Sequence, residues 1–366
     1  MKKGQCLRVV CGLLGLLILG SCSGKKQVQA VDLASLSMDE LIARAKEEGH
    51  VESVGMPDDW ANWGDSWKAI TQKYGITHHD TDMSSAEELA TFDAEKDSPT
   101  RDIGDVGQGN SNTAIEMGVV QGYKPSTWDS IPAWAKDPEG RWIISYIGTI
   151  AVLVNKDLSG GQEIRSWQEL KNSRVRLTLG NPAVAAVAQM GVLSAAYAFG
   201  GGIDNVQPGI DFFRELAQAG RLDSGAANPQ RFSMGEIEAA VSWDYYALAW
   251  RDQAVSVNPN TNAAVHVFSD GAVQSGYSLV FNKYAPHPHA TALTIEYLLS
   301  DEGQIDRARG YASPIRNVVL PADIQAKMID RAEYAAAVPL TDPAKLNAAV
   351  EQIVRKWEDE VMPLLN

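Results

Sequence analysis

Two tyrosines follow a carboxylate at the point where a short apolar segment ends. Residues 240–243 predict a strand that finishes at Trp243, and Asp244, Tyr245 and Tyr246 come directly after it. Ligands of open α/β sheets bind at the carboxyl ends of strands, so we expect these residues to form one wall of a ligand cleft. Aromatic faces beside a carboxylate suit an organic cation, because each cation–π contact contributes about 0.5–2 kcal/mol.

A second group of aromatic and acidic side chains follows the first predicted strand, residues 51–54. The loop after it contains Asp58, Asp59, Trp60 and Trp63, and this loop is the expected opposite wall of the cleft. An alternative is open for each residue type. The two tryptophans stand three apart and could belong to a hydrophobic core, and the aspartates, Asp244 included, could be helix N-caps.

Two more loops follow predicted strands. Residues 105–110 form a glycine-bearing loop, and residues 180–183 place Asn181 at the cap and Pro182 at the first position of a predicted helix. Free N–H groups at that helix start would suit a phosphate or carboxylate. The complete set of predicted ligand-binding residues is Asp58, Asp59, Trp60, Trp63, Gly107, Gln108, Thr149, Asn181, Trp243, Asp244, Tyr245 and Tyr277.

Metal binding and catalysis receive little support from the residue pattern. Tyr245 and Tyr246 could bind ferric iron as phenolates, but none of the four loops contains the histidine that such a site normally has. The chain shows no nucleophile elbow, Walker loop or dinucleotide-binding glycine fingerprint. We therefore predict a binding protein without catalytic residues or a cofactor.

The N-terminus has the features of a secretory signal peptide. Lys2 and Lys3 precede the apolar run 9–19, which is too short to span a membrane. Residues 19–22 resemble a bacterial lipobox, which implies lipidation of Cys22 and a membrane anchor; an ordinary signal peptide with a chance cysteine is the alternative. All three cysteines lie within residues 1–22, so disulfides and thiolate sites are excluded from the mature chain. The formal charge of −14 disfavours nucleic acid as a partner.

From residue 37 onward, strand, loop and helix alternate, which predicts an α/β fold with a largely parallel sheet. Ser37 with Glu40 and Ser85 with Glu88 have the spacing of capping boxes, which predicts a helix start at each place. The apolar stretch 142–156 is too long for one ordinary strand, and 276–282 is the expected return segment. A chain of 366 residues is long enough for two lobes. The predicted organisation is a signal peptide at 1–21, a tether at 22–36, a discontinuous first lobe at 37–150 and 278–366, and a second lobe at 151–277.

Four segments carry a resemblance to a known family: residues 41–49, 148–156, 166–170, and 298–304 with 314–316. Together they resemble a bacterial extracellular solute-binding protein of an ABC importer, of the iron and polyamine type. The resemblance implies a type 2 periplasmic-binding-protein fold, with two α/β lobes joined by two crossover strands. It also implies a monomer that passes a small solute to ABC permease and ATPase subunits.

The resemblance favours an organic cation such as a polyamine, because Trp60 and Asp244 look like polyamine-type positions. Tyr245 and Tyr246 are similar in kind to the paired tyrosines of the iron proteins, whose histidine has no counterpart in residues 56–63. Ferric iron or a phosphorylated solute is the alternative ligand. A surface lipoprotein that acts as an adhesin or receptor is the alternative to transport.

Overall fold

Two long strands run through the whole molecule. In this computed structural model, which describes residues 33, 35–223 and 225–365, β5 (Ile143–Asn155) and β10 (Ala272–Asn282) pair antiparallel along the middle. Both are almost entirely buried, in agreement with the long apolar run of β5, whereas β10 also buries polar residues such as Ser278 and Asn282. The predicted signal peptide, Cys22 and most of the tether lie outside the described residues.

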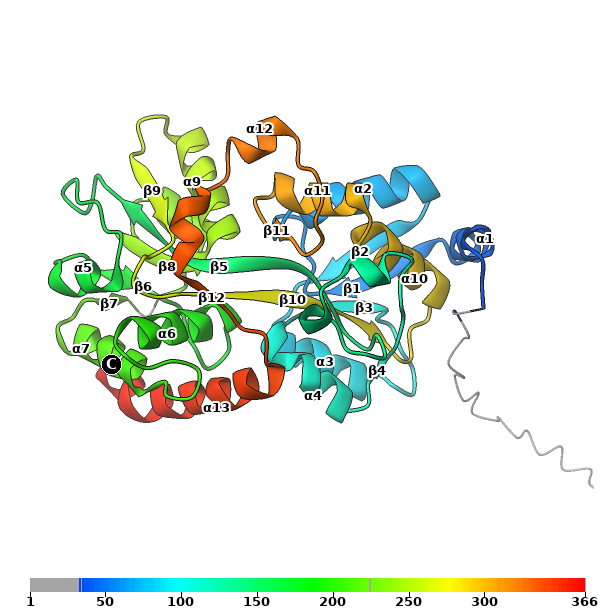
Figure 1. Ribbon diagram of the computed structural model, residues 1–366, viewed down its shortest axis with the longest axis horizontal. Helices are drawn as coiled ribbons and strands as arrows, with labels where there is room; N and C mark the ends of the chain where they lie inside the picture. The colour runs from blue at the N-terminus through cyan, green and yellow to red at the C-terminus, as the bar shows by residue number, and fades with distance from the viewer. Residues whose placement is uncertain (1–32, 34, 224, 366) are drawn as a thin grey trace, which may run out of the picture.

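One lobe is built on one half of these two strands. Three parallel strands lie beside β10 in the order β2-β1-β3-β10, and β10 runs antiparallel to β3. The strands of this lobe are β1 (His50–Val54), β2 (Thr77–Thr81), β3 (Ile103–Gly107), β4 (Val120–Gln121) and β11 (Ser313–Pro314). Helices cover both faces of this half of the sheet, as Figure 1 shows on its right side.

The second lobe is built on the other half of β5 and β10. Here the order is β5-β8-β6-β7, with β8 antiparallel to β5 and parallel to β6. Its strands are β6 (Leu177–Thr178), β7 (Leu222–Asp223), β8 (Ala239–Trp243), β9 (Ala263–His266) and β12 (Ala337–Pro339). The fold class predicted from the sequence, two α/β lobes joined by two crossover strands, is confirmed. The exact lobe boundaries stay predictions, since β5 and β10 belong to both lobes.

The α-helices of the described residues are α1 (Met38–Glu48), α2 (Trp63–Tyr74), α3 (Ser85–Ala94), α4 (Ser111–Glu116), α5 (Trp167–Asn172), α6 (Ala186–Ala198), α7 (Gln207–Gln218), α8 (Pro229–Ser233), α9 (Asp244–Val257), α10 (Pro288–Leu298), α11 (Asp301–Arg309), α12 (Ala322–Gln325) and α13 (Pro343–Glu360). Short 3-10 helices are η1 (Gln108–Asn110), η2 (Trp128–Ser130), η3 (Ala133–Ala135), η4 (Arg331–Ala336) and η5 (Met362–Leu364). Within the described part of the chain, none of these helices is long and apolar enough to cross a membrane.

Helix ends show where local sequence chemistry determined the structure. Ser37 and Glu40 form the predicted capping box at the start of α1, and Gly49 ends that helix in the left-handed conformation, with φ of 67°. The capping box of α3 is formed by Ser84 and Glu87, one residue earlier than the predicted pair, Ser85 and Glu88. That shift leaves the carboxylate of Glu88 free for another role.

The C-terminal part of the chain contacts both lobes. After β11 the chain crosses to the second lobe, where η4 is followed by β12, which pairs with β10. Helix α13 then packs on α6 and α7 of the second lobe and on η1 and α4 of the first. Residues 278–366 were assigned to the first lobe from the sequence; α13 lies against both.

Candidate functional site

A cavity of about 840 Å³ lies between the lobes, a volume suited to a small-molecule ligand. The first lobe contributes the loops that follow β1, β2 and β3, and the second contributes the loop before α6. Its lining residues are Gly55, Pro57, Asp59, Trp60, Asp82, Met83, Ser84, Ser85, Ala86, Glu87, Glu88, Asp105, Asn110, Ala183, Val184, Ala185, Ala186, Val187, Gln189, Tyr246, Tyr277 and Val350. The site is therefore at the carboxyl ends of the first lobe's strands, as the α/β sequence pattern predicts.

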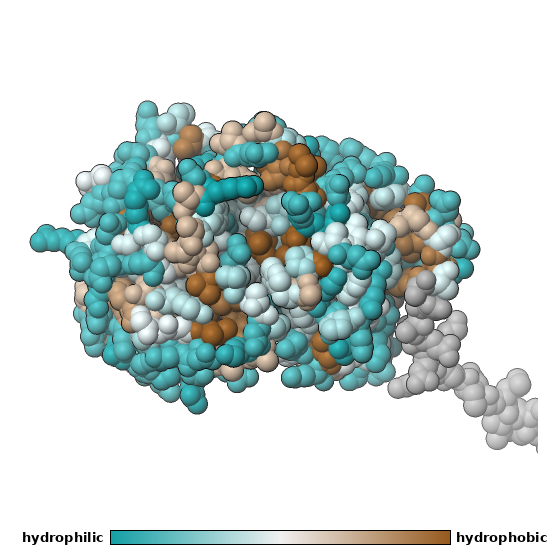
Figure 2. Space-filling view, in the orientation of Figure 1, coloured by the Kyte–Doolittle hydropathy of each residue, from teal (hydrophilic) through white to brown (hydrophobic). Residues whose placement is uncertain are grey.

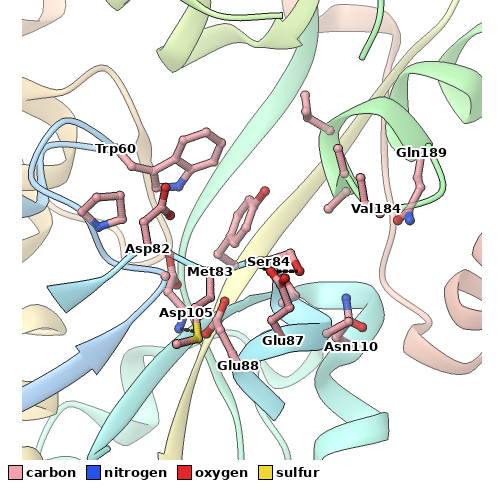
Figure 3. A pocket seen from close by; sticks show the side chains of 18 of the residues that line it. Trp60, Asp82, Met83, Ser84, Glu87, Glu88, Asp105, Asn110, Val184 and Gln189 are labelled. Carbon is pink, nitrogen blue, oxygen red and sulfur yellow. Dashed lines mark hydrogen bonds between the residues drawn. The ribbon is translucent and has the colours of Figure 1, made fainter. Parts of the chain in front are cut away.

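The first-lobe side of the cavity is strongly acidic. Five carboxylates line it, from Asp59, Asp82, Glu87, Glu88 and Asp105, and the lining includes no lysine, arginine or histidine. Figure 3 shows four of these acids grouped on one side of the pocket, with Val184 and Gln189 across from them. Such a surface attracts cations and repels anions.

The carboxylate of Glu88 is buried against the backbone of Gly55, Gly104 and Asp105. The side chain is only 1% exposed, and its Oε2 accepts a hydrogen bond of 2.9 Å from the backbone N–H of Asp105. A Cβ atom on either Gly55 or Gly104 would collide with this carboxylate, so both glycines are required. Burial, together with the negative charge of Asp105, raises the pKa of Glu88 well above its ordinary value.

Asp105 ends a chain of hydrogen bonds that begins at Trp60. The indole Nε1 of Trp60 donates to the Tyr146 hydroxyl at 2.7 Å, and that hydroxyl donates to Asp105 Oδ2 at 2.7 Å. The other oxygen, Oδ1, is buried without a hydrogen-bond partner. Burial raises the pKa of Asp105 to about 7, although the Tyr146 hydrogen bond and the charge of Arg307 act in the opposite direction.

The loop that carries Trp60 has an unusual backbone conformation, which hydrogen bonds to the first lobe stabilise. Ala61 and Asn62 have φ values of 44° and 57°, in the left-handed region, which alanine rarely adopts and asparagine adopts more readily. Helix α11 fixes them, since Asn62 Nδ2 donates to the Asp306 carbonyl at 2.8 Å and Arg307 donates to the Asn62 carbonyl at 2.9 Å. The strain is typical of a functional site and directs the indole of Trp60 toward the cleft.

The ring of Trp60 contacts aromatic residues from the rest of the cleft. Its ring centre lies 4.7 Å from that of Tyr246, 5.5 Å from that of Tyr277 and 5.6 Å from that of Tyr245. Tyr245 and Tyr246 come from α9 in the second lobe and Tyr277 from crossover strand β10. Trp60 therefore belongs to an aromatic cluster with these three tyrosines, and ligand binding by this cluster stays a prediction.

A protein-family model described as bacterial extracellular solute-binding protein matches residues 99–357, more than half of the chain. The chain belongs to this family. As a solute-binding transport family, it implies a small-molecule ligand, an ABC permease as partner and an extracellular or periplasmic location. The resemblance found in the sequence is thus confirmed at the level of the family.

Solved structures of periplasmic binding proteins share the fold of this solute-binding protein. The binding protein AfuA from Actinobacillus pleuropneumoniae, with fructose-6-phosphate bound, has a TM-score of 0.68 and 17% identity over 85% of this chain and 98% of its own. The ferric binding protein from Campylobacter jejuni has a TM-score of 0.65 and 16% identity, over 84% of this chain and 98% of its own. The Atu4243 GABA receptor has a TM-score of 0.65 and 15% identity, over 84% of this chain and 96% of its own. They confirm the type 2 periplasmic-binding fold.

Three of the residues predicted to bind ligand line the main cavity of this solute-binding protein: Asp59, Trp60 and Tyr277. Asp58 and Tyr245 instead line a smaller hollow of about 220 Å³. Trp63 is fully buried, with the Arg307 guanidinium 3.8 Å from its ring centre. Trp63 is therefore a core residue, which was the alternative interpretation of its position in the sequence.

Asp244 is buried beside the cleft and does not line the cavity. Its Oδ1 accepts hydrogen bonds from the backbone N–H groups of Thr149 at 3.1 Å and Tyr245 at 2.8 Å, and its Oδ2 accepts one from the Tyr334 hydroxyl at 2.8 Å. Burial raises the pKa of Asp244 to about 6 despite these donors. Thr149, also buried, acts here as a donor within the protein.

The remaining predicted residues lie near the cavity with their polar groups already engaged. Gln108 is buried, donating to the Leu340 carbonyl at 2.7 Å and accepting from Ser275 at 2.9 Å. Gly107 and the buried Trp243 line a narrow space beside it. The predicted helix start at Asn181 is wrong: its side chain accepts from the Ala183 N–H at 3.0 Å within a turn, and α6 begins at Ala186.

Four acidic residues were not predicted from the sequence, and they lie in the loop after β2, in the first turn of α3 and in β3. Asp82, Glu87, Glu88 and Asp105 line the cavity, but none was selected as a ligand-binding residue. A usable signal existed for Asp105, a carboxylate inside an otherwise apolar strand. Glu88 was interpreted as half of a capping box, which assigned its carboxylate to the helix.

Proposed function

We propose that this chain is the receptor of an ABC importer for an organic cation, such as an ammonium compound. The observation that carries the proposal is the acidity of the cavity, whose lining contains five acidic side chains and no basic one. The rings of Trp60, Tyr246 and Tyr277 add π faces within the same lining. A phosphorylated ligand would face only negative charge there.

The buried acids give cation binding a defined chemistry. Burial raises the pKa values of Glu88 and Asp105, so protons occupy these sites more than they would in water. A bound cation favours the ionised forms, and its arrival therefore releases protons. Contacts to both lobes then favour the closed arrangement over the open one.

The proposal also covers attachment and delivery. Lipidation at Cys22 would hold the receptor at the membrane, with residues 22–36 as a tether. As a monomer it would then present the loaded cleft to the permease, and the ATPase would drive uptake. A role as an adhesin or surface receptor is less well supported, because the family match is to solute-binding transport proteins.

Ferric iron is the second candidate ligand. Tyr245 and Tyr246 lie at the cleft, and the hydroxyl of Tyr245 is buried without a hydrogen-bond partner. Burial raises the pKa of Tyr245 well above its ordinary value, with the charges of nearby tyrosines and aspartates adding to the effect. Iron binding as a phenolate would have to overcome that cost, whereas a cation at Glu88 and Asp105 uses carboxyl groups that ionise far more readily.

The experiment that tests the proposal is a thermal-shift panel on the mature protein. The panel contains primary amines, quaternary ammonium compounds, ferric citrate, fructose-6-phosphate and neutral sugars, each at several concentrations. We expect amines to raise the melting temperature, because a ligand that binds only the folded state stabilises it. Stabilisation by fructose-6-phosphate or ferric citrate alone would refute the proposal.

A further inference from the structure

The two sides of the cavity differ in chemistry. All five lining carboxylates come from the first lobe, whereas the second-lobe loop contributes only alanine and valine side chains at residues 183–187. Val184 is 66% exposed, so its side chain is accessible to a ligand in the cavity. Figure 2 shows hydrophobic surface on the second-lobe side of the hollow between the lobes.

Polar groups on the second-lobe side are few and partly engaged. Gln189 donates from Nε2 to the Pro182 carbonyl at 2.9 Å, and Asn181 is used within its own turn. Tyr246 is the other polar side chain there, and it packs its ring against Trp60 and Trp250. Nothing on this side is negatively charged among the residues that line the cavity.

The acidic side, in contrast, places two buried carboxyl groups against the cavity. Glu88 is 1% exposed and Asp105 is 2% exposed, and both line the cavity. A buried negative charge is costly unless a positive charge lies beside it. The charged end of a cationic ligand would therefore lie on this side.

We infer that the ligand is an amphipathic cation, with one charged end at Glu88 and Asp105 and an apolar body against residues 183–187. This inference rests on the proposed function and narrows it. A polyamine with a charge at each end fits less well, since its second ammonium would lose water against aliphatic side chains without a carboxylate to replace it. The positive end of the α6 dipole would add to that cost.

Three ligands with the same six-carbon chain separate the possibilities. Hexylamine, 1,6-diaminohexane and 6-aminohexanoate all carry an ammonium group on the first carbon, and the sixth carbon is a methyl group, carries a second ammonium group or is a carboxylate, respectively. Titrations followed by calorimetry on the mature protein should give hexylamine the highest affinity. The α6 dipole would favour the carboxylate of 6-aminohexanoate by about twofold to fivefold in affinity, a gain smaller than the cost of desolvating a carboxylate against side chains that include no basic group. Hexylamine should also bind about tenfold more tightly than butylamine, because two more methylene groups are buried.

Two matched valine substitutions locate the apolar contact. Val184→Ser should weaken hexylamine binding severalfold and leave butylamine binding nearly unchanged. Val257→Ser is the control, since Val257 is 68% exposed but lies on α9 outside the cavity lining; it should change neither affinity. Tighter binding of the diamine or the amino acid would overturn this inference while the proposed function stands. Binding of no amine at all would overturn both.

Discussion

Asp105→Asn tests the central carboxylate of the cavity, with opposite expected effects on stability and on binding. Asparagine keeps the shape and can still accept the hydrogen bond from Tyr146, but it cannot ionise. The ordinary pKa is 3.8 and the folded protein raises it to about 7. One pKa unit corresponds to about 1.36 kcal/mol, so ionising Asp105 in the folded protein costs on the order of 4 kcal/mol more than ionising it in the unfolded chain.

The sign of the pH dependence follows from this raised pKa. Between pH 4 and 7 the unfolded chain loses the Asp105 proton while the folded protein keeps it, so this group lowers wild-type stability as the pH rises. Asp105→Asn removes that loss. The variant should therefore gain stability over wild type as pH increases, with the difference level above about pH 8. Urea unfolding of both proteins at pH 4, 6 and 8 measures this difference in the free energy of unfolding.

Cation binding should respond in the opposite direction. Loss of a hydrogen bond to a charged group costs about 1.5–3 kcal/mol, so the affinity for an amine at pH 8 should fall about tenfold to a hundredfold. The matched control is Asp137→Asn. Asp137 is also buried in the first lobe, but its hydrogen bonds with Arg141 and neighbouring backbone outweigh the effect of burial and lower its pKa.

The control should behave in the reverse way to Asp105→Asn. Asp137→Asn should destabilise the protein at neutral pH and leave amine affinity unchanged, because Asp137 lies outside the cavity lining. Our reasoning would be refuted if Asp105→Asn lost stability relative to wild type as the pH rose, or if it bound amines as tightly as wild type at pH 8.

Three further substitutions test other parts of the structure. Trp60→Ala should weaken amine binding by about 0.5–2 kcal/mol in a calorimetric titration, whereas Trp60→Phe should retain most of the affinity; equal losses would argue against a π contact. Tyr334→Phe removes a donor to Asp244 and should cost about 1.5–3 kcal/mol in urea unfolding at pH 8. The loss should be smaller at pH 5, where Asp244 is protonated, and a pH-independent loss would contradict this. Ser37→Ala should cost about 0.5–2 kcal/mol through the lost cap, with amine affinity unchanged; a weakened affinity would link α1 to the site.

The lobe architecture was predictable because it depends on features that are local in sequence. The apolar stretch that became β5 is longer than an ordinary strand, so a crossover was the natural interpretation. The capping box at Ser37 and the αL glycine at Gly49 likewise act through neighbours a few residues away. Such signals need no knowledge of the tertiary structure.

The site was only partly predictable, because its chemistry depends on distant partners. Asp244 lies at the end of a strand, as expected. Its carboxylate accepts hydrogen bonds from Thr149 and Tyr334, which are about 90 residues away in the sequence on either side. Glu88 looked like a helix cap until the structure placed it between Gly55 and Gly104. Ligand contact by Asp59, Trp60 and Tyr277, which do line the cavity, stays a prediction.

Proton release on ligand binding is the most direct test of the claim that buried carboxyl groups bind a cation. Calorimetry of hexylamine binding at pH 6.5, in two buffers with different ionisation enthalpies, measures the protons exchanged. The amine itself remains charged at this pH. Because burial raises the pKa values of Glu88 and Asp105, we predict that ligand binding releases protons, and that Asp105→Asn releases fewer. Proton uptake, or binding without any exchange, would contradict the account.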